Sequence, residues 1–387
     1  MWCMLVLQRG IAMEKRRKYH VIIGSCNFFD KVVASFLAEH DVDCFIDLVK
    51  HSDECKRNGS TFYGETSFLI LKNNNYHGIV ETAHDRLGSL IEELTEEDAE
   101  IYVHNPPRIL MEFLNGQKEL GNIAMELCNE EYDIDRNTTQ FVEKINAVSK
   151  NIIGQEKAVE EVSKSLWYLT NSKRQRPYVV MLYGNSSLGK TELVREVAQN
   201  FFEGKFLEKH LSMFKNNNYA DYFFGDAPNR ISIGFDLLER ESNLIFFDEL
   251  DKCPDYFYSA FYTLFDNTLF KDATYDVNIS GTLFLLTTNF NSEDEIKKNL
   301  GLPLFYRIDK FIHFEDFSTE VINKLTWKEI HSRMNELPSD ITSEMIYKKV
   351  SPFINASSEN ARTIKYKVQQ VIENIMYEDI KRDFTNE

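Results

Sequence analysis

The octet GNSSLGKT at residues 184–191 constrains the fold of this chain more than any other stretch. It follows the apolar run YVVMLY (178–183) and precedes ELVREVAQNFF, in which apolar residues recur at helical spacing. A strand, a glycine-bounded loop and a helix in this order form the context that a phosphate-binding P-loop requires. The sequence therefore predicts that the chain binds a nucleoside triphosphate.

Each part of the octet has a chemical role in such a loop. Two glycines let the backbone turn so that its amides face the phosphates, and the helix N-terminus adds its positive end. The lysine reaches the terminal phosphates, and the threonine hydroxyl can ligate Mg²⁺. The predicted nucleotide-binding residues of the loop are Gly184, Asn185, Ser186, Ser187, Leu188, Gly189, Lys190 and Thr191.

Two later apolar runs also end in polar residues suited to nucleotide chemistry. LIFFDELDK (244–252) places two adjacent carboxylates after a strand, where Asp248 can hold Mg²⁺ and Glu249 can polarise an attacking water. The alternative is an ordinary buried strand that ends in surface acids. TLFLLTTNF (282–290) places Asn289 where its amide could orient that water, although any strand end can carry polar residues.

Two arginines follow, each in a segment that contains both apolar and polar residues. Arg307 lies among apolar residues in LFYRIDKFIHF (304–314), where it is either buried against a carboxylate or an arginine finger for a neighbouring subunit's nucleotide. Arg362 stands in the first turn of NARTIKYKVQQVIENIM (360–376), where it either reads the nucleotide state or is a solvated charge. One apolar helical face is expected there, formed by Ile364, Val368, Val371 and Ile375.

Together with GQEKAVEEVSKSL (154–166), these motifs resemble, in identity and order, the ATPase module of Clp-type AAA+ unfoldases, above all the second ATPase ring of ClpA and ClpB. The resemblance covers about residues 145–380 and implies a P-loop AAA+ large α/β domain, with a parallel sheet covered by helices, and a small helical lid. It also implies ATP and Mg²⁺ as cofactors, and a homo-oligomer, usually a hexamer, with nucleotide between subunits.

The same resemblance assigns roles to individual residues. Asp248 and Glu249 would be the Mg²⁺-binding and catalytic carboxylates, and Asn289 the first sensor. Arg307 would be the arginine finger and Arg362 the second sensor. The segment around Gln155 would border the adenine.

Composition shifts predict four segments: a lead at 1–18 that is either disordered or an over-extended start, a separate N-terminal α/β domain at 19–135, the ATPase domain at 136–315 and the lid at 316–387. In the N-terminal domain, strands are expected within 19–25, 43–50, 66–72 and 99–107, and helices within 30–40, 77–94 and 108–116. Six of the nine histidines lie there, but their spacings match no usual metal-ligand pattern.

The formal net charge of −17 disfavours a nucleic-acid partner. The longest apolar runs fall short of about 18 residues, so no membrane span is expected. The six cysteines form no CxxC pair, which is typical of reduced thiols and a cytoplasmic location.

The segment FFGDAPNRISIGFD (223–236) departs from the pattern of Clp unfoldases. Its glycine and GFD flanks match the substrate-gripping pore loop, but NRISIG (229–234) replaces the aromatic grip, while Phe223 and Phe224 are expected in the core.

The main hypothesis is an ATP-hydrolysing oligomer that remodels or unfolds a protein client recruited by residues 19–135. One alternative is a partner-activated nucleotide switch or scaffold, similar to torsins. Another is an enzyme whose active centre lies in 19–135, with the ATPase as regulator.

Overall fold

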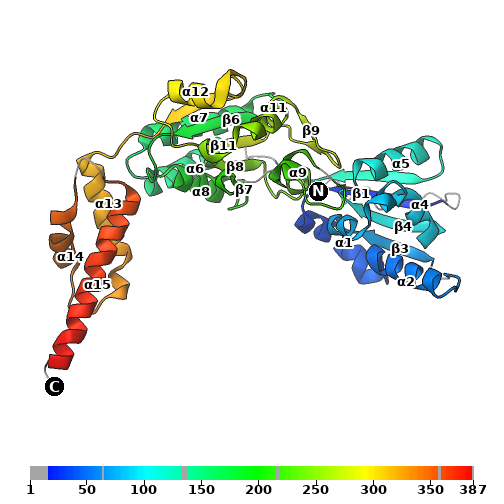
Figure 1. The fold of residues 1–387 in the computed structure, drawn as a ribbon, viewed down its shortest axis with the longest axis horizontal. Coiled ribbons are helices and arrows are strands. Elements are labelled where there is room, and N and C mark those ends of the chain that lie inside the picture. Colours follow the sequence, from blue (N-terminus) through cyan, green and yellow to red (C-terminus); the bar gives the residue numbers. More distant parts are fainter. Residues whose placement is uncertain are drawn as a thin grey trace.

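The chain forms an arch of three parts, seen in a computed structural model that describes residues 16–62, 65–132, 137–214, 218–225, 227–355 and 359–385 (Figure 1). An N-terminal domain, from β1 to β5, occupies one end of the arch. A central domain, from α6 to β12, forms the crown, and a helical domain, from α13 to α15, forms the other end. The expected lead at 1–18 lies largely outside the described residues, and β1 already begins at Lys18.

The N-terminal domain is a five-stranded parallel sheet in the order β2-β3-β4-β1-β5. Helix α1 covers one face, and α2, α4 and α5 cover the other, each burying apolar side chains against the strands. The strands are β1 (Lys18–Ile23), β2 (Asp43–Cys44), β3 (Thr66–Leu71), β4 (Thr95–His104) and β5 (Ala124–Asn129). The helices are α1 (Cys26–Glu39), α2 (Phe45–Arg57), α3 (Glu81–His84), α4 (Leu87–Leu94) and α5 (Arg108–Glu119).

Two expectations for this domain were wrong. The predicted strand at 43–50 pairs only over β2, and the chain continues as α2, because Phe45 and Leu48 pack one helical turn apart into the core. A short apolar run of this kind fits a buried helix as well as a strand. The predicted single helix at 77–94 is divided into α3 and α4, and this break lets the buried His84 contact the carbonyl of Tyr76 at 2.9 Å. Strand β5 was not anticipated.

The central domain is a second five-stranded parallel sheet, in the order β12-β6-β11-β8-β7. Its inner strands are apolar up to their last residues because both faces are covered: Val180 and Leu182 of β6 enter one core, and Val179 and Met181 enter the other. The strands are β6 (Tyr178–Tyr183), β7 (Leu207–His210), β8 (Leu244–Asp248), β11 (Leu283–Thr287) and β12 (Lys310–His313).

Three helices cover each face of the central sheet. On one face lie α6 (Thr138–Asn151), α7 (Glu156–Asn171) and α8 (Lys190–Phe201). On the other lie α10 (Ile233–Leu238), α11 (Tyr258–Asp266) and α12 (Glu293–Phe305). A hairpin of β9 (Leu269–Lys271) and β10 (Asp276–Asn278), together with α9 (Asn218–Phe224), lies toward the N-terminal domain (Figure 1).

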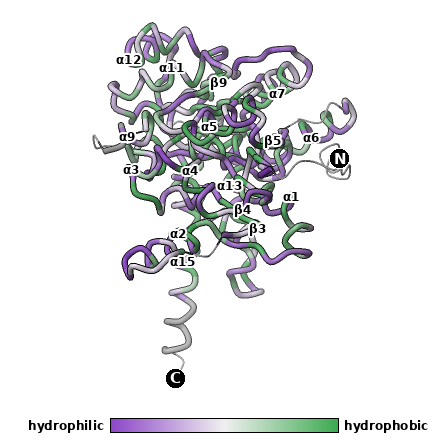
Figure 2. Tube along the Cα trace, turned by 90° about the vertical axis from the view of Figure 1, so that its right-hand side faces the viewer, coloured by the Kyte–Doolittle hydropathy of each residue, from purple (hydrophilic) through white to green (hydrophobic). Residues whose placement is uncertain are grey.

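The helical domain contains α13 (Thr319–Ser332), α14 (Ser343–Val350) and α15 (Ala361–Thr385). The expected apolar face of α15 is confirmed, since its four predicted residues are all buried. They pack with Ile322 and Ile330 of α13 and with Ile346 of α14, in a core continuous with one face of the central sheet. Figure 2 shows the chain from the end of the arch that carries the N-terminal domain, coloured by hydropathy.

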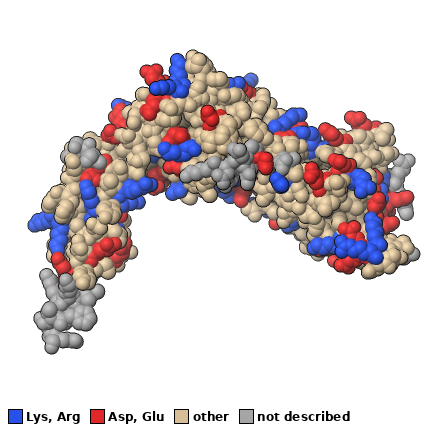
Figure 3. All heavy atoms as spheres, viewed as in Figure 1, with Lys and Arg blue, Asp and Glu red and all other residues tan. Residues whose placement is uncertain are grey.

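Charges of both signs are interspersed over the face of the arch drawn in Figure 3, rather than separated into one basic and one acidic surface. Within the described ranges, no helix combines the length and the apolar character needed to cross a bilayer.

Candidate nucleotide site

The carboxyl ends of β6, β8 and β11 bring the predicted site residues to one edge of the central sheet. These three strands are parallel neighbours, so the segments that follow them emerge side by side. Residues 184–189 follow β6, Asp248 ends β8 with Glu249 directly after it, and Asn289 follows β11. In open parallel sheets, ligands bind at this edge.

The loop 184–189 curves because three of its residues adopt positive φ: Gly184 at 131°, Ser187 at 61° and Gly189 at 101°. A Cβ atom on Gly184 would lie 2.5 Å from the carbonyl oxygen of Phe314, so this position requires glycine. A Cβ on Gly189 would meet nothing within 4 Å, so there the positive φ is the constraint. Helix α8 begins directly after this curve, which is the backbone arrangement that holds phosphates.

The Lys190 side chain is held inside the loop. Its ammonium donates to the carbonyl oxygens of Gly184 at 2.6 Å and Asn185 at 2.7 Å, and to Oδ1 of Asn289 at 3.2 Å. The residue is only 7% exposed. Burial lowers the pKa of the ammonium to about 8, although the nearby carboxylates of Asp251 and Asp248 oppose the shift.

Thr191 and Asp248 lie close enough to share a metal ion. The Thr191 hydroxyl is 3.5 Å from Oδ1 of Asp248, and both supply the oxygen ligands that Mg²⁺ prefers. The same Oδ1 accepts a hydrogen bond from the buried hydroxyl of Thr287, which fixes the carboxylate. On the other side, Nδ1 of His210 lies 3.4 Å from Oδ2 of Asp248. The site residues therefore fit a magnesium–triphosphate complex.

Glu249 adopts a left-handed backbone conformation, with φ 59° and ψ 51°. Such a conformation is strained for a residue with a Cβ, and strain of this kind is common at functional sites. Its amide donates to the Thr287 hydroxyl at 2.9 Å, so one threonine orients both acidic residues of β8. Thr287 was not among the predicted site residues; its only sequence signal is its place at the end of β11.

Asp251 is a second residue that the sequence reasoning missed. Its Oδ1 accepts the amide of Asn289 at 3.1 Å, and its side chain is almost fully buried. It therefore ties the segment after β11 to the segment after β8 and places a carboxylate near Lys190. Its position two residues beyond Glu249, in DELDK, was the available signal.

One contact joins the helical domain to the phosphate loop, and another joins the loop to the segment just before that domain. The buried Gln155 amide, at the start of α7, donates to the carbonyl of Glu315 at 2.9 Å and to that of Leu188 at 3.4 Å. The amide of Ala361, the first residue of α15, donates to the carbonyl of Ser187 at 3.1 Å. The next residue, Arg362, is exposed, and its role as a sensor stays a prediction.

Within the part of the chain that the structure describes, Arg307 contacts residues away from the phosphate loop. Its guanidinium donates to Oδ2 of Asp266 at 2.7 Å and to the Pro303 carbonyl at 2.6 Å, and it lies over the ring of Tyr262 at 4.5 Å. Within one subunit, Arg307 is thus paired with a carboxylate, which was one of the two expectations for it.

One expectation for the segment that resembles a pore loop was wrong. Phe223 is buried, as expected, but Phe224 is 46% exposed, because it ends α9 and only its backbone is tied, through Ala273, to the hairpin turn. Ile231 is 56% exposed. Ser232 caps α10 and donates to the buried Asp272 at 2.5 Å, which fixes the end of the segment.

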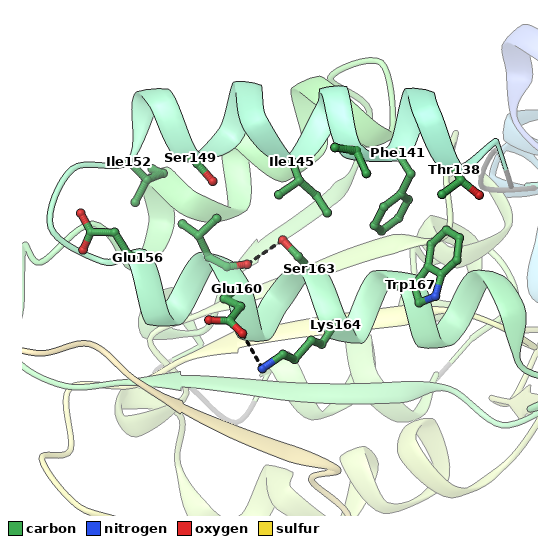
Figure 4. A pocket seen from close by; sticks show the side chains of 12 residues that line it. Thr138, Phe141, Ile145, Ser149, Ile152, Glu156, Glu160, Ser163, Lys164 and Trp167 are labelled. Carbon is green, nitrogen blue, oxygen red and sulfur yellow. Dashed lines mark hydrogen bonds and ion pairs between the residues drawn. The ribbon is translucent and has the colours of Figure 1, made fainter.

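An apolar groove of about 480 Å³ runs between α6 and α7 (Figure 4). Phe141, Ile145 and Trp167 line it, and an ion pair between Glu160 and Lys164 stands along one side. None of the predicted nucleotide-site residues borders this groove.

Comparison with known proteins agrees with this geometry. Residues 175–346, which include the phosphate loop, both acidic residues of β8 and Asn289, match the family model described as AAA domain (Cdc48 subfamily). This part of the chain is therefore similar to AAA domains.

Chaperones of the Clp group are among its relatives. The chain is 22% identical over 278 residues to chaperone protein ClpB of Malacoplasma penetrans, covering 64% of this chain and 39% of that protein. It is 23% identical over 359 residues to ClpB of Chlamydia caviae, covering 80% and 41%. A chloroplastic ClpC of Pisum sativum is 24% identical over 208 residues, covering 50% and 23%. The chain thus spans about two fifths of the length of these ClpB relatives.

Proposed function

We propose that the protein is a Mg²⁺-dependent ATPase of Clp type that remodels or unfolds a protein client as an oligomeric ring. The observation that carries this proposal is the convergence of Lys190, Thr191, Asp248, Glu249 and Asn289 at one sheet edge, beside a curved loop and a helix N-terminus. The similarity to ClpB chaperones supports the choice of a protein client.

The roles follow from the positions. The loop amides and Lys190 bind the phosphates, while Thr191 and Asp248 hold Mg²⁺, which when bound neutralises charge on the phosphoryl oxygens. Glu249 accepts a proton from the attacking water, and the Asn289 amide orients that water. Thr287 keeps both carboxylates in place through its hydroxyl.

Movement would pass from the loop to the helical domain through the backbone. Ser187 accepts a hydrogen bond from Ala361 at the start of α15. Leu188 accepts one from Gln155, whose amide also bonds to Glu315 just before the helical domain. A loop that tightens around phosphate therefore shifts α15, and Arg362 on its first turn would sense the same phosphates.

The client would meet the segment between α9 and α10. Phe224 supplies an exposed aromatic ring and Ile231 an exposed aliphatic side chain on this segment. An aromatic ring offers a large, rigid contact to a passing backbone. Residues 19–135 would recruit the client, and the protein would act in the cytoplasm.

Replacement of the proposed base tests the chemistry. Glu249→Gln should bind a fluorescent ATP analogue normally but lower kcat by at least about 100-fold, because general-base catalysis contributes on that scale. Glu208→Gln, a carboxylate on the neighbouring strand β7, is the matched control and should retain turnover. Unchanged turnover in Glu249→Gln would contradict the assignment of Glu249 as the general base.

The role of Arg307 across subunits is tested by mixing. Arg307→Ala subunits and Glu249→Gln subunits are each expected to be inactive alone. In a mixed ring, an intact Arg307 can face an intact Glu249, so some hydrolysis should return. Absence of activity at every mixing ratio, with ring assembly confirmed by light scattering, argues against a finger that acts across subunits.

A second candidate function is a nucleotide switch or scaffold that needs a partner for activation. The fixed end of the pore-like segment favours it, since Ser232 and the Gly234 amide both bond to Asp272. An assay on a fluorescent tagged client discriminates between the two. ATP-dependent loss of client fluorescence supports the unfoldase, whereas ATP-dependent binding without unfolding supports the switch.

A further inference from the structure

The two sheets of this protein have the same strand order. Numbered along its own domain, each reads 5-1-4-3-2 with all strands parallel. In such sheets, ligands bind beyond the carboxyl ends of the strands at the point where the strand order reverses. That point lies between β6 and β11 in the central domain, where Lys190 meets Asn289. In the N-terminal domain it lies between β1 and β4, beside Gly24 and Asn105.

The N-terminal crevice at this point is built differently. Six residues separate β6 from α8, but only Gly24 and Ser25 separate β1 from α1, so no loop can wrap a chain of phosphates. The Asn105 side chain fills the curve, accepting from the Gly24 amide at 2.9 Å and donating to the Gly24 carbonyl at 2.8 Å. The buried His104 also contacts that carbonyl at 2.8 Å.

A carboxylate from the central domain enters this crevice. Oε2 of Glu239 accepts the amide of Cys26, the first residue of α1, at 2.9 Å. Oε1 accepts the amides of Asn73 at 2.8 Å and Asn105 at 3.2 Å. The Glu239 side chain remains 21% exposed, whereas the side chains of Asn73 and Asn105 are buried.

The donors at the crevice suit one carboxylate. They are a helix N-terminus, two neutral side-chain amides and Nε2 of the buried His104, which lies 3.7 Å from Oε1 of Glu239. The nearby Lys72 is paired with Asp30 at 2.8 Å. The adjoining amide of Ser25 is already bonded to Glu130 of the same domain at 2.7 Å. A triphosphate carries several negative charges and needs cationic partners and a metal, which this set does not offer. A single carboxylate at a helix N-terminus needs neither.

Glu239 directly follows α10, so the crevice holds the element that ends the pore-like segment. Arg108, at the start of α5, adds a second grip: it bonds to Asp276 at 2.6 Å and to the carbonyls of Asp272 and Tyr275 in the hairpin. Tyr132 donates to the Arg240 carbonyl at 2.7 Å. The N-terminal domain is thereby fixed to both elements that hold the end of segment 229–234.

We propose that the crevice between β1 and β4 is a protein-carboxylate-binding site in a domain that shares the strand arrangement of the ATPase sheet, and that Glu239 is its intramolecular ligand. Through Glu239 the N-terminal domain sets the position of α10 and the pore-like segment. The site stands on geometry alone and does not depend on ATP hydrolysis, so its test is independent of the function proposed above.

Hydrogen exchange in the full-length chain tests the contact. Glu239→Gln places an amide opposite the Asn73 and Asn105 amides, so peptides covering 24–30 and 233–240 should exchange roughly tenfold faster or more, as expected for loss of charge-assisted hydrogen bonds. Glu241→Gln is the matched control, because Glu241 bonds to Asn27 and Lys205 at the surface. Wild-type exchange in Glu239→Gln would overturn the proposal.

A second variant distinguishes loss of this contact from misfolding of the chain. Asn73→Asp sets two carboxylates against each other and should also accelerate exchange. Combined with Glu239→Gln, it offers a new acceptor to the glutamine amide and should restore protection. Failure of the double variant to recover any protection, with a native far-UV spectrum, contradicts a specific contact.

The remaining alternative is that the crevice binds a nucleotide rather than a protein carboxylate. In a Lys190→Ala/Glu239→Gln chain the ATPase site is disabled and the crevice is freed of its carboxylate. A fluorescent ATP analogue should then show no saturable binding. Saturable binding that is lost on adding Asn105→Asp would show a second nucleotide site and overturn the assignment to a protein carboxylate.

Discussion

The backbone amide of Ala361 donates a hydrogen bond to the carbonyl oxygen of Ser187 at 3.1 Å, so the long helix of the helical domain begins on the phosphate loop. The next residue, Arg362, is exposed beside the loop. Arg362→Ala should lower kcat roughly tenfold or more at saturating ATP, since one hydrogen bond to a charged group is lost. Steady-state phosphate release measures this. Lys365→Ala, one turn further along α15, should have little effect, and equal losses in both variants would contradict a specific role for Arg362.

The hydroxyl of Thr287 orients both acidic residues of β8, so its removal should impair catalysis without unfolding the chain. Thr287→Val keeps the shape of the side chain but frees Asp248 and the Glu249 amide, which we expect to lower kcat about tenfold. Thr282→Val, at the opposite end of the same strand segment, is the control. A thermal melt confirms folding. If Thr282→Val loses as much activity as Thr287→Val, the effect lies in strand packing.

ATP binding should become linked to proton uptake at alkaline pH. Burial lowers the pKa of Lys190 to about 8 in the ligand-free protein. Phosphate favours the charged amine and raises this pKa in the complex, so affinity should fall as the pH rises through about 8. Calorimetry in buffers of different ionisation enthalpy measures the uptake. Lys190→Arg, always charged, should show none; equal uptake in this variant assigns the proton elsewhere.

Acid should destabilise the N-terminal domain through His104. Burial lowers the pKa of His104 below its ordinary 6.5, although Glu239 and Asp30 oppose the shift. Below about pH 6.5 the unfolded chain therefore binds a proton that the folded chain resists, and the free energy of unfolding falls as the pH decreases. Urea unfolding of the full chain over this range tests it. His104→Gln should flatten the profile relative to the exposed His51→Gln, and matching profiles would exclude His104 as the cause.

Client contact should depend on the exposed ring of Phe224. Phe224→Ala removes a large rigid surface and should slow ATP-dependent client unfolding while leaving basal ATP hydrolysis unchanged. Tyr256→Ala, equally exposed but outside the segment 223–236, is the matched control. Client unfolding at the wild-type rate in Phe224→Ala would place the grip elsewhere, with Ile231 as the next residue to replace.

The convergence of the candidate nucleotide-site residues was largely predictable from sequence, because phosphate chemistry demands fixed residue types at fixed spacing. The octet, Asp248, Glu249 and Asn289 all follow apolar strands, and parallel pairing brings them together. Thr287 and Asp251 were missed because a hydroxyl at a strand end and a further acid in DELDK have no distinctive pattern. Their importance comes from contacts across strands.

The N-terminal domain was predicted as α/β, but not its strand order or its attachment. The segment at 43–50 formed a helix because tertiary burial of Phe45 and Leu48 decided between two local possibilities. Phe224 was expected in the core with Phe223, yet neighbours at the end of a helix point to different sides. The bond between Cys26 and Glu239 spans 213 positions, a separation that local patterns do not encode.

The ion pair between Arg307 and Asp266 has a consequence for assembly. If Arg307 serves a neighbouring subunit, Asp266 competes with that neighbour's phosphates for the same guanidinium, and Tyr262 adds to the competing side. Ring formation would then be favoured only when ATP supplies the stronger counter-charge. Subunits would disperse as the nucleotide is spent, and assembly would follow the energy supply of the cell rather than the protein concentration alone.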